Sequence, residues 1–360
     1  MTKLKRVLIM AGGTGGHVFP GLSVAKKLRE KNIHVDWLGT RKGLEATLVP
    51  GAHIPIHFIS ISGVRGKGMK DIALAPFRVA IAIGQAFRII HKLKPDIVLG
   101  MGGFASAPGG IASRLLGYPL VIHEQNAIPG TANRYLAYVA KKVLEGFPGT
   151  FLKREKVMTV GNPVREEIAA LSFSFPDKRA HFRLLILGGS LGAAAINQLV
   201  PHALQKIPIE LRPEVYHQTG EKHYADTVKI YQSVGVTANI VPFIKEMDRA
   251  YTWADVVLCR AGALTIAELC AAGRGAILVP FPAAIDDHQT ANAHFMAAQE
   301  AALLIQQSAL TADKLADVLQ ELIQSPERYY AMGKAAYALR KVDAAERIIN
   351  IFEEIKRERK

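Results

Sequence analysis

Short apolar runs alternate with longer amphipathic stretches along the first half of the chain, and this pattern predicts strands separated by helices. The predicted strands are residues 7–10, 33–38, 54–61, 97–100, 120–123, 142–145 and 157–160. Helix-like segments lie between them, for example residues 71–94 and 111–116. This order predicts a parallel sheet with helices on both faces.

The second half of the chain begins with the same design as the first. An apolar strand at residues 184–187 leads into a glycine-rich turn at 188–192, and a helix is expected from Ala193. A further strand, turn and helix follow at residues 255–259, 260–263 and 264–272, and then a strand at 276–282. The repetition predicts two similar α/β domains with parallel sheets that face one another across a cleft. Ligands in such sheets bind beyond the carboxyl ends of the strands.

The first glycine-rich turn, residues 11–17, carries four glycines around Thr14. A strand, a glycine turn and a helix start place backbone N–H groups and the positive end of a helix where an anion can bind. His17 stands at the rim of this turn, where a side chain that accepts protons is useful. A tight connection with an incidental histidine is the alternative explanation.

Two further strand ends carry residues that are unusual for a buried sheet. A second glycine-rich turn, residues 100–104, follows one predicted strand, and the sequence His-Glu-Gln-Asn at residues 123–126 follows the next. Turn formation accounts for the glycines, but it does not require four polar residues in a row at a strand end, where they are poor core material. We therefore favour a ligand site at this edge of the sheet.

A nicotinamide-dinucleotide site is a weaker interpretation of the first turn. The G-x-G-x-x-G fingerprint is only half met, because Val18 stands where the last glycine belongs. The acidic residue that holds the ribose should end the second strand, whereas Asp36 falls inside that strand. Both features argue against a dehydrogenase.

The helix that follows residues 260–263 offers a second candidate site. Glu268 lies about one turn into this helix, where its carboxylate can accept hydrogen bonds from a ribose diol while the helix start meets a pyrophosphate. A solvated glutamate on a helix surface is the alternative. Ser190 is placed like Thr14 at a helix start, where its hydroxyl can meet phosphate or act as an N-cap. A polar cluster at residues 286–293 again follows a strand.

Length and composition limit the possible functions. A chain of 360 residues with 49% hydrophobic and 21% charged residues predicts two folded domains. The formal net charge of +14 fits nucleic acid, anionic lipid or a phosphorylated substrate, but no lysine-rich tail or aromatic RNA-binding motif supports the first. Cys259 and Cys270 form neither a disulfide framework nor a metal set. Because the first strand starts by Val7 and no apolar run reaches the roughly 18 residues of a membrane span, we expect folding in a reducing cytosol.

Residues 62–88 combine a basic, glycine-bearing start with an apolar helix. The cations Lys67 and Lys70 precede apolar residues at helical spacing, among them Leu74 and Phe77. A basic rim beside an apolar helical face can lie on an anionic membrane surface. The alternative is an ordinary helix that packs its apolar face on the sheet.

Taken together, these stretches resemble the bacterial murein glycosyltransferase family, which adds N-acetylglucosamine to the undecaprenyl-linked muramyl-pentapeptide and so converts lipid I into lipid II. The resemblance runs nearly from end to end of the chain. Its motifs are residues 12–21, 61–68 (ISGVRGKG), 100–104, 123–126, 161–165, 188–192 and 260–268. Each motif is weak alone, but their order and spacing together are highly specific.

The resemblance implies the type B glycosyltransferase fold (GT-B) with three parts. Residues 1–162 would form the acceptor and membrane-facing domain, residues 163–340 the domain that binds the UDP-sugar, and residues 341–360 a last helix that returns to the first domain. The implied donor contacts are Thr14, Gly15, Gly16, Asn126, Arg165, Ser190, Ile244, Ala263, Leu264, Thr265, Ile266, Ala267, Glu268 and Gln289. The implied acceptor-side residues are Gly102, Gly103 and Glu124.

Individual roles follow from the same resemblance. The backbone of Ile244 would meet the uracil, Glu268 would hold the ribose, and Arg165 with Ser190 would serve the diphosphate. The protein would associate peripherally with the cytoplasmic face of the inner membrane. Its partners would be UDP-N-acetylglucosamine, the undecaprenyl-linked muramyl-pentapeptide, an anionic membrane surface and other cell-wall assembly proteins, with no nucleic acid.

The predicted reaction is an inverting displacement at the anomeric carbon of the donor sugar, with no cofactor. The acceptor hydroxyl must lose a proton to a base within hydrogen-bond reach; His17 is the first candidate and Glu124 the second. The sequence has no Asp-x-Asp pair for a metal. Helix N-termini at Ala193 and Leu264, together with Arg165, are therefore expected to stabilise the leaving diphosphate.

Two other functions fit parts of the sequence. A nucleotide-sugar epimerase can share this architecture, but it needs neither a lipid nor a basic apolar rim. A non-enzymatic, nucleotide-regulated membrane scaffold would keep Glu268 and lose His17 and Glu124, which are present here.

Overall fold

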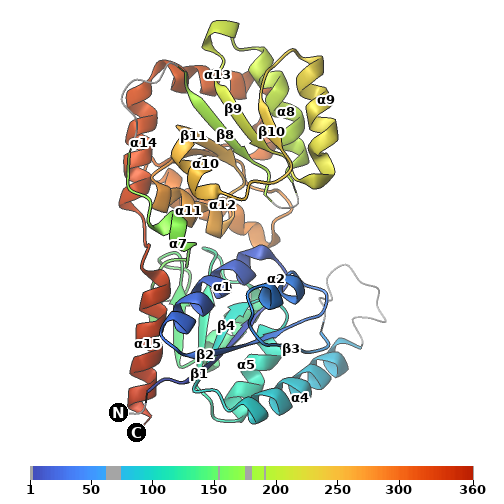
Figure 1. Ribbon diagram of the computed structural model, residues 1–360, viewed down its shortest axis with the longest axis vertical. Coiled ribbons are helices and arrows are strands. Elements are labelled where there is room, and N and C mark those ends of the chain that lie inside the picture. Colours follow the sequence, from blue (N-terminus) through green and yellow to red (C-terminus); the bar gives the residue numbers. More distant parts are fainter. Residues whose placement is uncertain (1–2, 62–73, 153–154, 175–180, 190–191, 360) are drawn as a thin grey trace. The chain divides into compact units, whose positions relative to one another are not determined.

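The computed structural model describes residues 3–61, 74–152, 155–174, 181–189 and 192–359. They form two units, of which unit 1 consists of Met1–Arg165 and Val342–Lys360, and unit 2 of Glu166–Lys341 (Figure 1). The basic start of the segment 62–88, including Lys67 and Lys70, lies outside the described residues, and so does Ser190.

Within the described residues, unit 1 has a seven-stranded sheet in the order β3-β2-β1-β4-β5-β6-β7, and all neighbouring strands are parallel. The strands are β1 (Arg6–Ala11), β2 (His34–Gly39), β3 (Ile56–Phe58), β4 (Ile97–Gly102), β5 (Leu120–Glu124), β6 (Lys142–Glu145) and β7 (Val157–Thr159). The prediction of a parallel sheet is confirmed. The strand order reverses between β1 and β4, and the crevice at such a switch point is where sheets of this kind bind ligands.

The helices of unit 1 include one from the far end of the chain. They are α1 (Gly15–Glu30), α2 (Glu45–Gly51), α4 (Ala75–Leu93), α5 (Ser106–Leu115), α6 (Thr131–Val139) and α15 (Ala344–Glu358). The apolar face of α15 is buried in the core that α1 also lines, with Ile348 and Phe352 fully covered. Lys31 on α1 pairs with Glu346 on α15 (2.6 Å).

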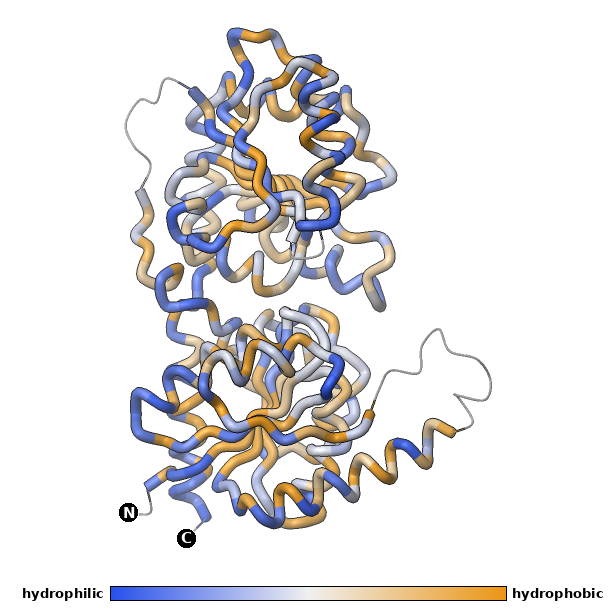
Figure 2. Tube along the Cα trace, turned by 45° about the vertical axis from the view of Figure 1, so that its right-hand side comes forward, coloured by the Kyte–Doolittle hydropathy of each residue, from blue (hydrophilic) through white to orange (hydrophobic). Residues whose placement is uncertain are grey.

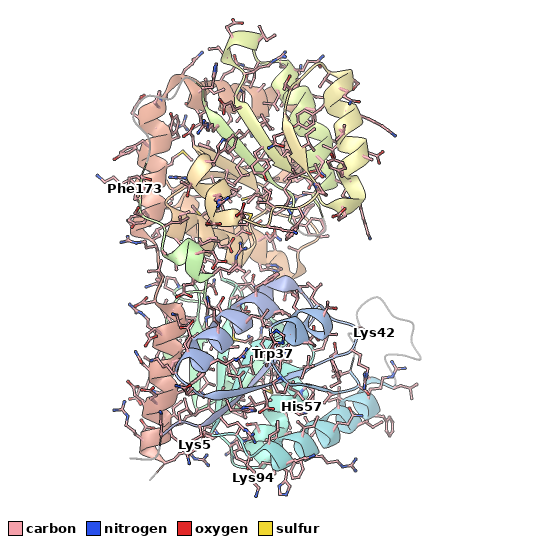
Figure 3. The ribbon with its side chains drawn as sticks, in the orientation of Figure 1. Lys5, Trp37, Lys42, His57, Lys94 and Phe173 are labelled. Carbon is pink, nitrogen blue, oxygen red and sulfur yellow. The ribbon has the colours of Figure 1, made fainter. Side chains whose placement is uncertain are left out.

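The side chain of Trp37 packs against α1 and bonds to the neighbouring strand β1. The indole Nε1 of Trp37 on β2 donates to the carbonyl oxygen of Ala11 (2.9 Å), and Figure 3 labels this ring beneath α1. A Cβ on Gly21 would lie 2.6 Å from the Trp37 ring, so glycine at this position lets the helix approach the indole closely.

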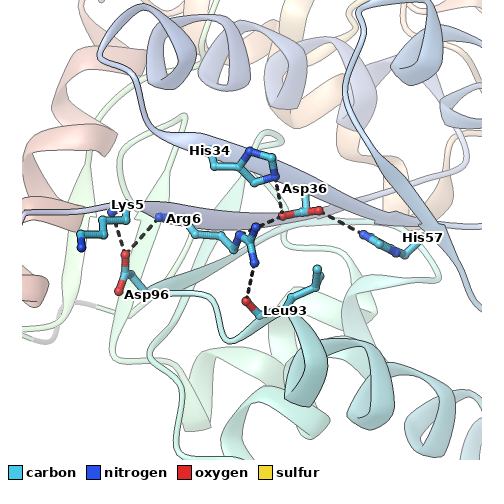
Figure 4. Close-up of polar contacts among 7 residues, drawn as sticks. All are labelled: Lys5, Arg6, His34, Asp36, His57, Leu93 and Asp96. Atoms are coloured by element: carbon cyan, nitrogen blue, oxygen red, sulfur yellow. Dashed lines mark hydrogen bonds and ion pairs between the residues drawn. The ribbon is translucent and has the colours of Figure 1, made fainter.

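Polar side chains near the starts of β1 and β2 are engaged with one another (Figure 4). Asp36, 3% exposed, lies 3.1 Å from His57 Nε2, 3.3 Å from His34 Nε2 and 3.5 Å from Arg6 Nε. Asp96 accepts hydrogen bonds from two backbone N–H groups at the start of the sheet and from Lys356 on α15. The Asp36 carboxylate lies inside β2, next to the guanidinium of Arg6 and the rings of His34 and His57. It is therefore not placed to hold a ribose at the strand end.

Unit 2 repeats the doubly wound plan. Within the described residues its six parallel strands follow the order β10-β9-β8-β11-β12-β13. They are β8 (Arg183–Leu187), β9 (Glu214–Gln218), β10 (Asn239–Val241), β11 (Val256–Cys259), β12 (Gly275–Leu278) and β13 (Ala302–Leu304). The prediction of two α/β units with parallel sheets is confirmed.

Helices accompany the strands of this second sheet. The α-helices are α7 (Glu166–Ala169), α8 (Ala194–Gln205), α9 (Tyr224–Ser233), α10 (Met247–Trp253), α11 (Ala263–Ala272), α12 (His288–Ala297), α13 (Ala312–Gln324) and α14 (Pro326–Ala338). Short 3-10 turns are η1 (Ile209–Leu211), η2 (Glu221–His223), η3 (Ile285–Asp287) and η4 (Gln307–Ala309). The strand order reverses between β8 and β11.

Two predicted boundaries were wrong. The strand expected at residues 276–282 ends at Leu278, because Pro280 and Pro282 have no N–H for the ladder. The helix expected from Ile111 starts one and a half turns earlier, at Ser106. Its first residues include Pro108 and two glycines, which are weak helix formers.

The strands of the two sheets and helix α4 differ in their pattern of hydropathy. In Figure 2 the strands inside each unit are apolar, whereas apolar and polar residues alternate along α4. This helix buries Ala82, Ala86 and Ile90 and exposes Phe77 and Ile81. No helix in the described ranges is long and apolar enough to cross a membrane.

Candidate functional site

Two glycine turns of unit 1 pack against each other where the strand order reverses. A side chain on Gly103, which has φ +80°, would collide with the carbonyl oxygen of Gly12. A Cβ on Gly102, which has φ +101°, would lie 2.9 Å from the His17 ring. Ser106 Oγ secures the second turn by accepting a hydrogen bond from the Gly102 N–H (3.1 Å). The structure therefore brings His17 next to Gly102, and it packs Gly103, the second of the three residues expected on the acceptor side, against Gly12.

The start of α1 presents backbone N–H groups at this turn. Thr14 is the N-cap residue with extended backbone (φ −98°, ψ 162°), and Gly15 and Gly16 begin the helix. The first N–H groups of a helix have no partner within it, and Thr14 and Gly16 are exposed. This geometry suits an anion or a sugar hydroxyl.

A buried carboxylate that the sequence analysis missed fixes the shape of this turn. Glu45 at the start of α2 is fully buried, and its Oε2 accepts a hydrogen bond from the Gly13 N–H (3.0 Å). Its Oε1 accepts from the N–H (2.9 Å) and the hydroxyl (2.8 Å) of Thr40. A Cβ on Gly12 would lie 2.5 Å from Oε1, and one on Gly43 would collide with the carboxylate. The carboxylate thus fills the space that these glycines leave.

His17 is joined to β5 by a chain of side-chain hydrogen bonds. Its Nδ1 lies 2.8 Å from Gln125 Oε1, and Gln125 Nε2 lies 3.0 Å from His123 Nδ1. His123 Nε2 lies 2.8 Å from the carbonyl oxygen of Gly161. His123 is completely buried, and this desolvation lowers its pKa to about 4, against the opposing effect of the Gly161 hydrogen bond. His123 is therefore neutral at physiological pH.

Glu124 serves the loop after β5. The side chain is 1% exposed, and its Oε1 accepts hydrogen bonds from the N–H (3.0 Å) and the Nδ2 (3.2 Å) of Asn126. Its Oε2 accepts from the Gly130 N–H (3.1 Å) and from Asn133 Nδ2 (3.0 Å). Each oxygen thus has two donors, and this geometry makes Glu124 a residue that orders the loop and positions Asn126.

In unit 2, the ends of β8 and β11 again carry turns. Gly188 and Gly192 flank Ser190, which lies outside the described residues, and α8 has Ala193 as its N-cap residue. The turn after β11 leads from Gly262 into α11, where Ala263–Glu268 form the first turns. The first N–H groups of α11 have no acceptor within the helix, and a helix start of this kind suits a diphosphate.

Glu268 is buried, which excludes the alternative of a solvated surface glutamate. Its side chain is 6% exposed, and its Oε2 accepts a hydrogen bond from the hydroxyl of Tyr251 on α10 (3.0 Å). Tyr251 is fully buried, and its own carbonyl oxygen accepts from Arg274 Nε (2.6 Å). The carboxylate orientation is thus set by a neighbouring helix, as a ribose-binding group requires.

The remaining expected donor contacts lie at separate places in the structure. A pocket of about 790 Å³ is lined by Phe243, Ile244 and Trp253 among others, but among the described residues neither the start of α11 nor Gln289 lines it. Gln289 on α12 accepts a hydrogen bond from the Phe281 N–H (2.9 Å) through its Oε1. Arg165 is half-buried and is the last residue of the first segment of unit 1.

The sequence indicated only some of the residues that shape the candidate site of each unit. Gln125 and His123 belong to a motif that the sequence analysis singled out, but neither was given a role. Glu45 and Tyr251 carried no signal, because Gly13 lies 32 positions from Glu45 and Glu268 lies 17 positions from Tyr251. Within the described part of the chain, no group of three or more His, Cys, Asp or Glu side chains could hold a metal ion.

Comparisons with known proteins agree with this architecture. The model of the glycosyltransferase family 28 N-terminal domain matches residues 7–145, and that of the glycosyltransferase family 28 C-terminal domain matches residues 183–348. The chain is 50% identical over 351 residues to the UDP-N-acetylglucosamine–N-acetylmuramyl-(pentapeptide) pyrophosphoryl-undecaprenol N-acetylglucosamine transferase of Ectopseudomonas mendocina. This match covers 98% of the chain and 99% of the transferase.

Solved structures give the same result. The crystal structure of Acinetobacter baumannii MurG has a TM-score of 0.84 and 40% identity, and the match covers 97% of this chain and 99% of that one. A putative UDP-N-acetylglucosamine 2-epimerase from Listeria monocytogenes has a TM-score of 0.69 at 13% identity, covering 99% of this chain and 98% of that one. The latter likeness shows the fold alone.

Proposed function

The chain belongs to glycosyltransferase family 28, and from this premise we propose that it transfers N-acetylglucosamine from UDP-N-acetylglucosamine to the N-acetylmuramyl-pentapeptide of pyrophosphoryl-undecaprenol, in peptidoglycan synthesis. The observation that carries this proposal is the identity of 50% to a transferase of that name over 98% of the chain. An identity of 13% to an epimerase gives no comparable support for isomerisation. Residues that suit acceptor activation, including His17, argue against a scaffold without activity.

The reaction is a displacement at the anomeric carbon with inversion. His17 takes the proton of the acceptor hydroxyl, and the acceptor oxygen forms a bond to the anomeric carbon. The bond from that carbon to the diphosphate oxygen breaks, and UDP leaves with the electron pair. The packing of Gly102 against His17, and of Gly103 against Gly12 in the same turn, supports an acceptor site beside this base.

The nucleotide part of the donor belongs to unit 2 in this proposal. Glu268, oriented by Tyr251, accepts hydrogen bonds from the ribose hydroxyls, and the backbone of Ile244 meets the uracil. The diphosphate lies at the starts of α8 and α11, where the helix dipoles and N–H groups stabilise its developing charge, together with Arg165 and Ser190. Thr14, Gly15, Gly16, Asn126 and Gln289 complete the donor contacts.

The exposed face of α4 suits attachment to the membrane that carries the acceptor. Leu74 (49% exposed), Phe77 (70%) and Ile81 (58%) lie one turn apart along this helix, with the exposed Arg88 further along the same face. Apolar side chains beside cations bind at the surface of an anionic bilayer. We place the protein peripherally on the cytoplasmic face of the inner membrane, where other cell-wall assembly proteins are available as partners.

Sedimentation with anionic liposomes tests the membrane proposal. Replacement of Leu74 and Phe77 by Ser should reduce the bound fraction severalfold, whereas the same replacement at the exposed Ile209 of unit 2 should leave it unchanged. Equal sedimentation of both variants would contradict the proposal.

One assay tests the activity itself. Labelled UDP-N-acetylglucosamine is incubated with and without the lipid acceptor, and the products are separated. Transfer that depends on the acceptor supports the proposal; isomerisation without it supports an epimerase, and binding alone supports a scaffold. His17→Ala should lower turnover by about 10²- to 10⁴-fold, the usual contribution of a general base, with donor binding retained.

A further inference from the structure

The hydrogen bonds from Gly161 to His17 form an unbroken line of four groups within unit 1. The line runs from the Gly161 carbonyl through His123 and the Gln125 amide to His17, with heavy-atom distances of 2.8, 3.0 and 2.8 Å. His123 and Gln125 are 0% and 1% exposed. Only His17 at its end is half-buried. Because each group in this buried line has a defined neighbour, the position of each proton follows from which atoms can donate and which can only accept.

The assignment starts at the carbonyl oxygen of Gly161, which can only accept. His123 Nε2 must therefore carry a proton and donate it. Because burial keeps His123 neutral, its Nδ1 has no proton and can only accept. The group of Gln125 that faces this nitrogen must be the NH2, and the carbonyl oxygen Oε1 must face His17. The orientation of the amide thus follows from its neighbours.

The last step concerns His17. Since Gln125 Oε1 can only accept, Nδ1 of His17 must hold the proton between them. In the neutral ring the other nitrogen, Nε2, then carries the lone pair. We propose that Gln125 and His123 are positioning residues that hold His17 in the Nδ1–H tautomer, so that Nε2 is ready to take the proton of the acceptor hydroxyl. This inference rests on the proposed function of His17 as the base.

Further contacts prevent the amide from turning over. The second proton of Gln125 Nε2 is donated to the carbonyl oxygen of His123 (3.2 Å). The backbone of Gln125 is held as well, because its carbonyl oxygen accepts a hydrogen bond from Asn162 Nδ2 (2.9 Å). A flipped amide would point Oε1 at the lone pair of His123 Nδ1 and its NH2 at His17. Both His123 contacts would then be lost inside a buried site, where unsatisfied polar groups are costly.

A neutral amide has a different effect on His17 than a carboxylate would have. A carboxylate at the same place would also hold the Nδ1 proton, but its charge would favour the imidazolium form and so resist release of the proton. Gln125 fixes the tautomer without adding a charge. Gln125→Glu therefore tests the effect of a charge at this position.

The first test observes the unmodified protein. Two-dimensional NMR of the protein with ¹⁵N-labelled histidine at pH 7.5 distinguishes the two tautomers, and His17→Gln and His123→Gln assign the signals. We expect His17 as the Nδ1–H form and His123 as the Nε2–H form. An Nε2–H form of His17, or rapid exchange between its two forms, would overturn the inference whether or not the protein transfers sugar.

The second test uses kinetics. Gln125→Leu should lower kcat on the order of 10²- to 10⁴-fold, the range for a base with a misplaced proton, with the KM for UDP-N-acetylglucosamine changed less than about threefold. Gln125→Glu should move the acidic limb of the kcat/KM profile to higher pH by about 1 to 3 units, as an adjacent carboxylate does. An unmoved limb, or near-normal kcat in a folded Gln125→Leu protein, would refute the proposal.

Asn197→Leu is the matched control. Asn197 is a buried amide in unit 2 whose Oδ1 lies 3.0 Å from His217 Nε2, and Tyr231 lies at the other ring nitrogen (2.9 Å). This replacement also removes an amide from a buried histidine, and it should lower thermal stability. It should leave kcat and the acidic limb unchanged; a loss of kcat as large as that of Gln125→Leu, or a limb that moves as in Gln125→Glu, would show that the effects arise from general destabilisation and would refute the proposal.

Discussion

Replacement of Glu45 by Gln tests whether one buried carboxylate sets the geometry of the first glycine turn. Glu45 is fully buried, and it accepts hydrogen bonds from Gly13 through Oε2 and twice from Thr40 through Oε1. Gln has almost the same shape, and its oxygen can keep both bonds from Thr40. Its NH2 group would then face the Gly13 N–H, so that two donors meet where a donor met an acceptor.

The magnitude follows from the contact that is lost. A hydrogen bond to a charged group contributes about 1.5–3 kcal/mol, and a buried donor left without an acceptor costs a similar amount. We therefore expect Glu45→Gln to lower the free energy of unfolding of unit 1 by about 2–3 kcal/mol. For a domain of this size, this corresponds to a decrease in Tm of roughly 5–10 °C. Turnover should fall as well, because the same turn carries the start of α1 and His17.

Tryptophan fluorescence can follow the unfolding of unit 1 alone. The chain has 2 tryptophans, and in a Trp253→Phe background only the buried Trp37 of unit 1 reports urea unfolding. Glu30→Gln is the matched control, because Glu30 is an exposed partner of Lys27 on α1 and such pairs contribute below about 1 kcal/mol. Equal urea midpoints for the two variants would refute the reasoning.

Three further predictions concern other buried groups. Hydrogen bonds from Lys356 and from two backbone N–H groups outweigh burial and hold the pKa of Asp96 below its ordinary value of 3.8. This stabilisation is present above pH 3.8 and is lost as the pH falls through the lowered pKa, so Asp96→Asn should speed hydrogen exchange in α15 at pH 7, and the difference from the unmodified protein should shrink as the pH falls below 3.8. Burial lowers the pKa of His217 from 6.5 to about 3, so as the pH falls the unfolded chain binds a proton at this histidine before the folded chain does. The free energy of unfolding should therefore fall by about 1.4 kcal/mol per pH unit below 6.5. His217→Gln should reduce this slope in urea titrations. Tyr251→Phe removes the hydroxyl donor of Glu268 and should weaken UDP binding about five- to tenfold, for a loss of about 1 kcal/mol; unchanged calorimetric affinity would contradict the role of this pair.

The sequence predicted the fold well where burial dominates. Strands covered on both faces are continuous apolar runs, and β1, β6 and β8 appear where such runs stand. The strand order itself was not predicted in detail, because pairing depends on contacts between residues distant in the sequence. The end of β12 was missed because apolar residues continue past Leu278, and only the prolines mark that the hydrogen-bonded ladder stops.

The candidate site was predictable only where side chains follow each other at a strand end. His17 and the motif at residues 123–126 stand out because glycines and polar residues are unusual there. Their connection through Gln125 could not be foreseen, because it joins α1 to β5 across 108 positions of sequence. Glu45 looks like any acidic residue in the first turn of a helix, where an acid is favourable. Its burial against Gly12, Gly39 and Gly43 is visible only in the folded chain.

The hydrogen bonds around the two glycine turns separate the groups that shape the site from the group that can react. Glu45 accepts three hydrogen bonds. Glu124 accepts two at each oxygen, so it would have to break contacts with the loop before it took a proton. His17 has to break none, because its Nδ1 already donates to Gln125 and the proton arrives at the opposite nitrogen. The same geometry that makes Glu124 a poor base thus makes it a good support for Asn126. Between the two candidates for proton transfer, this difference in hydrogen bonding favours His17.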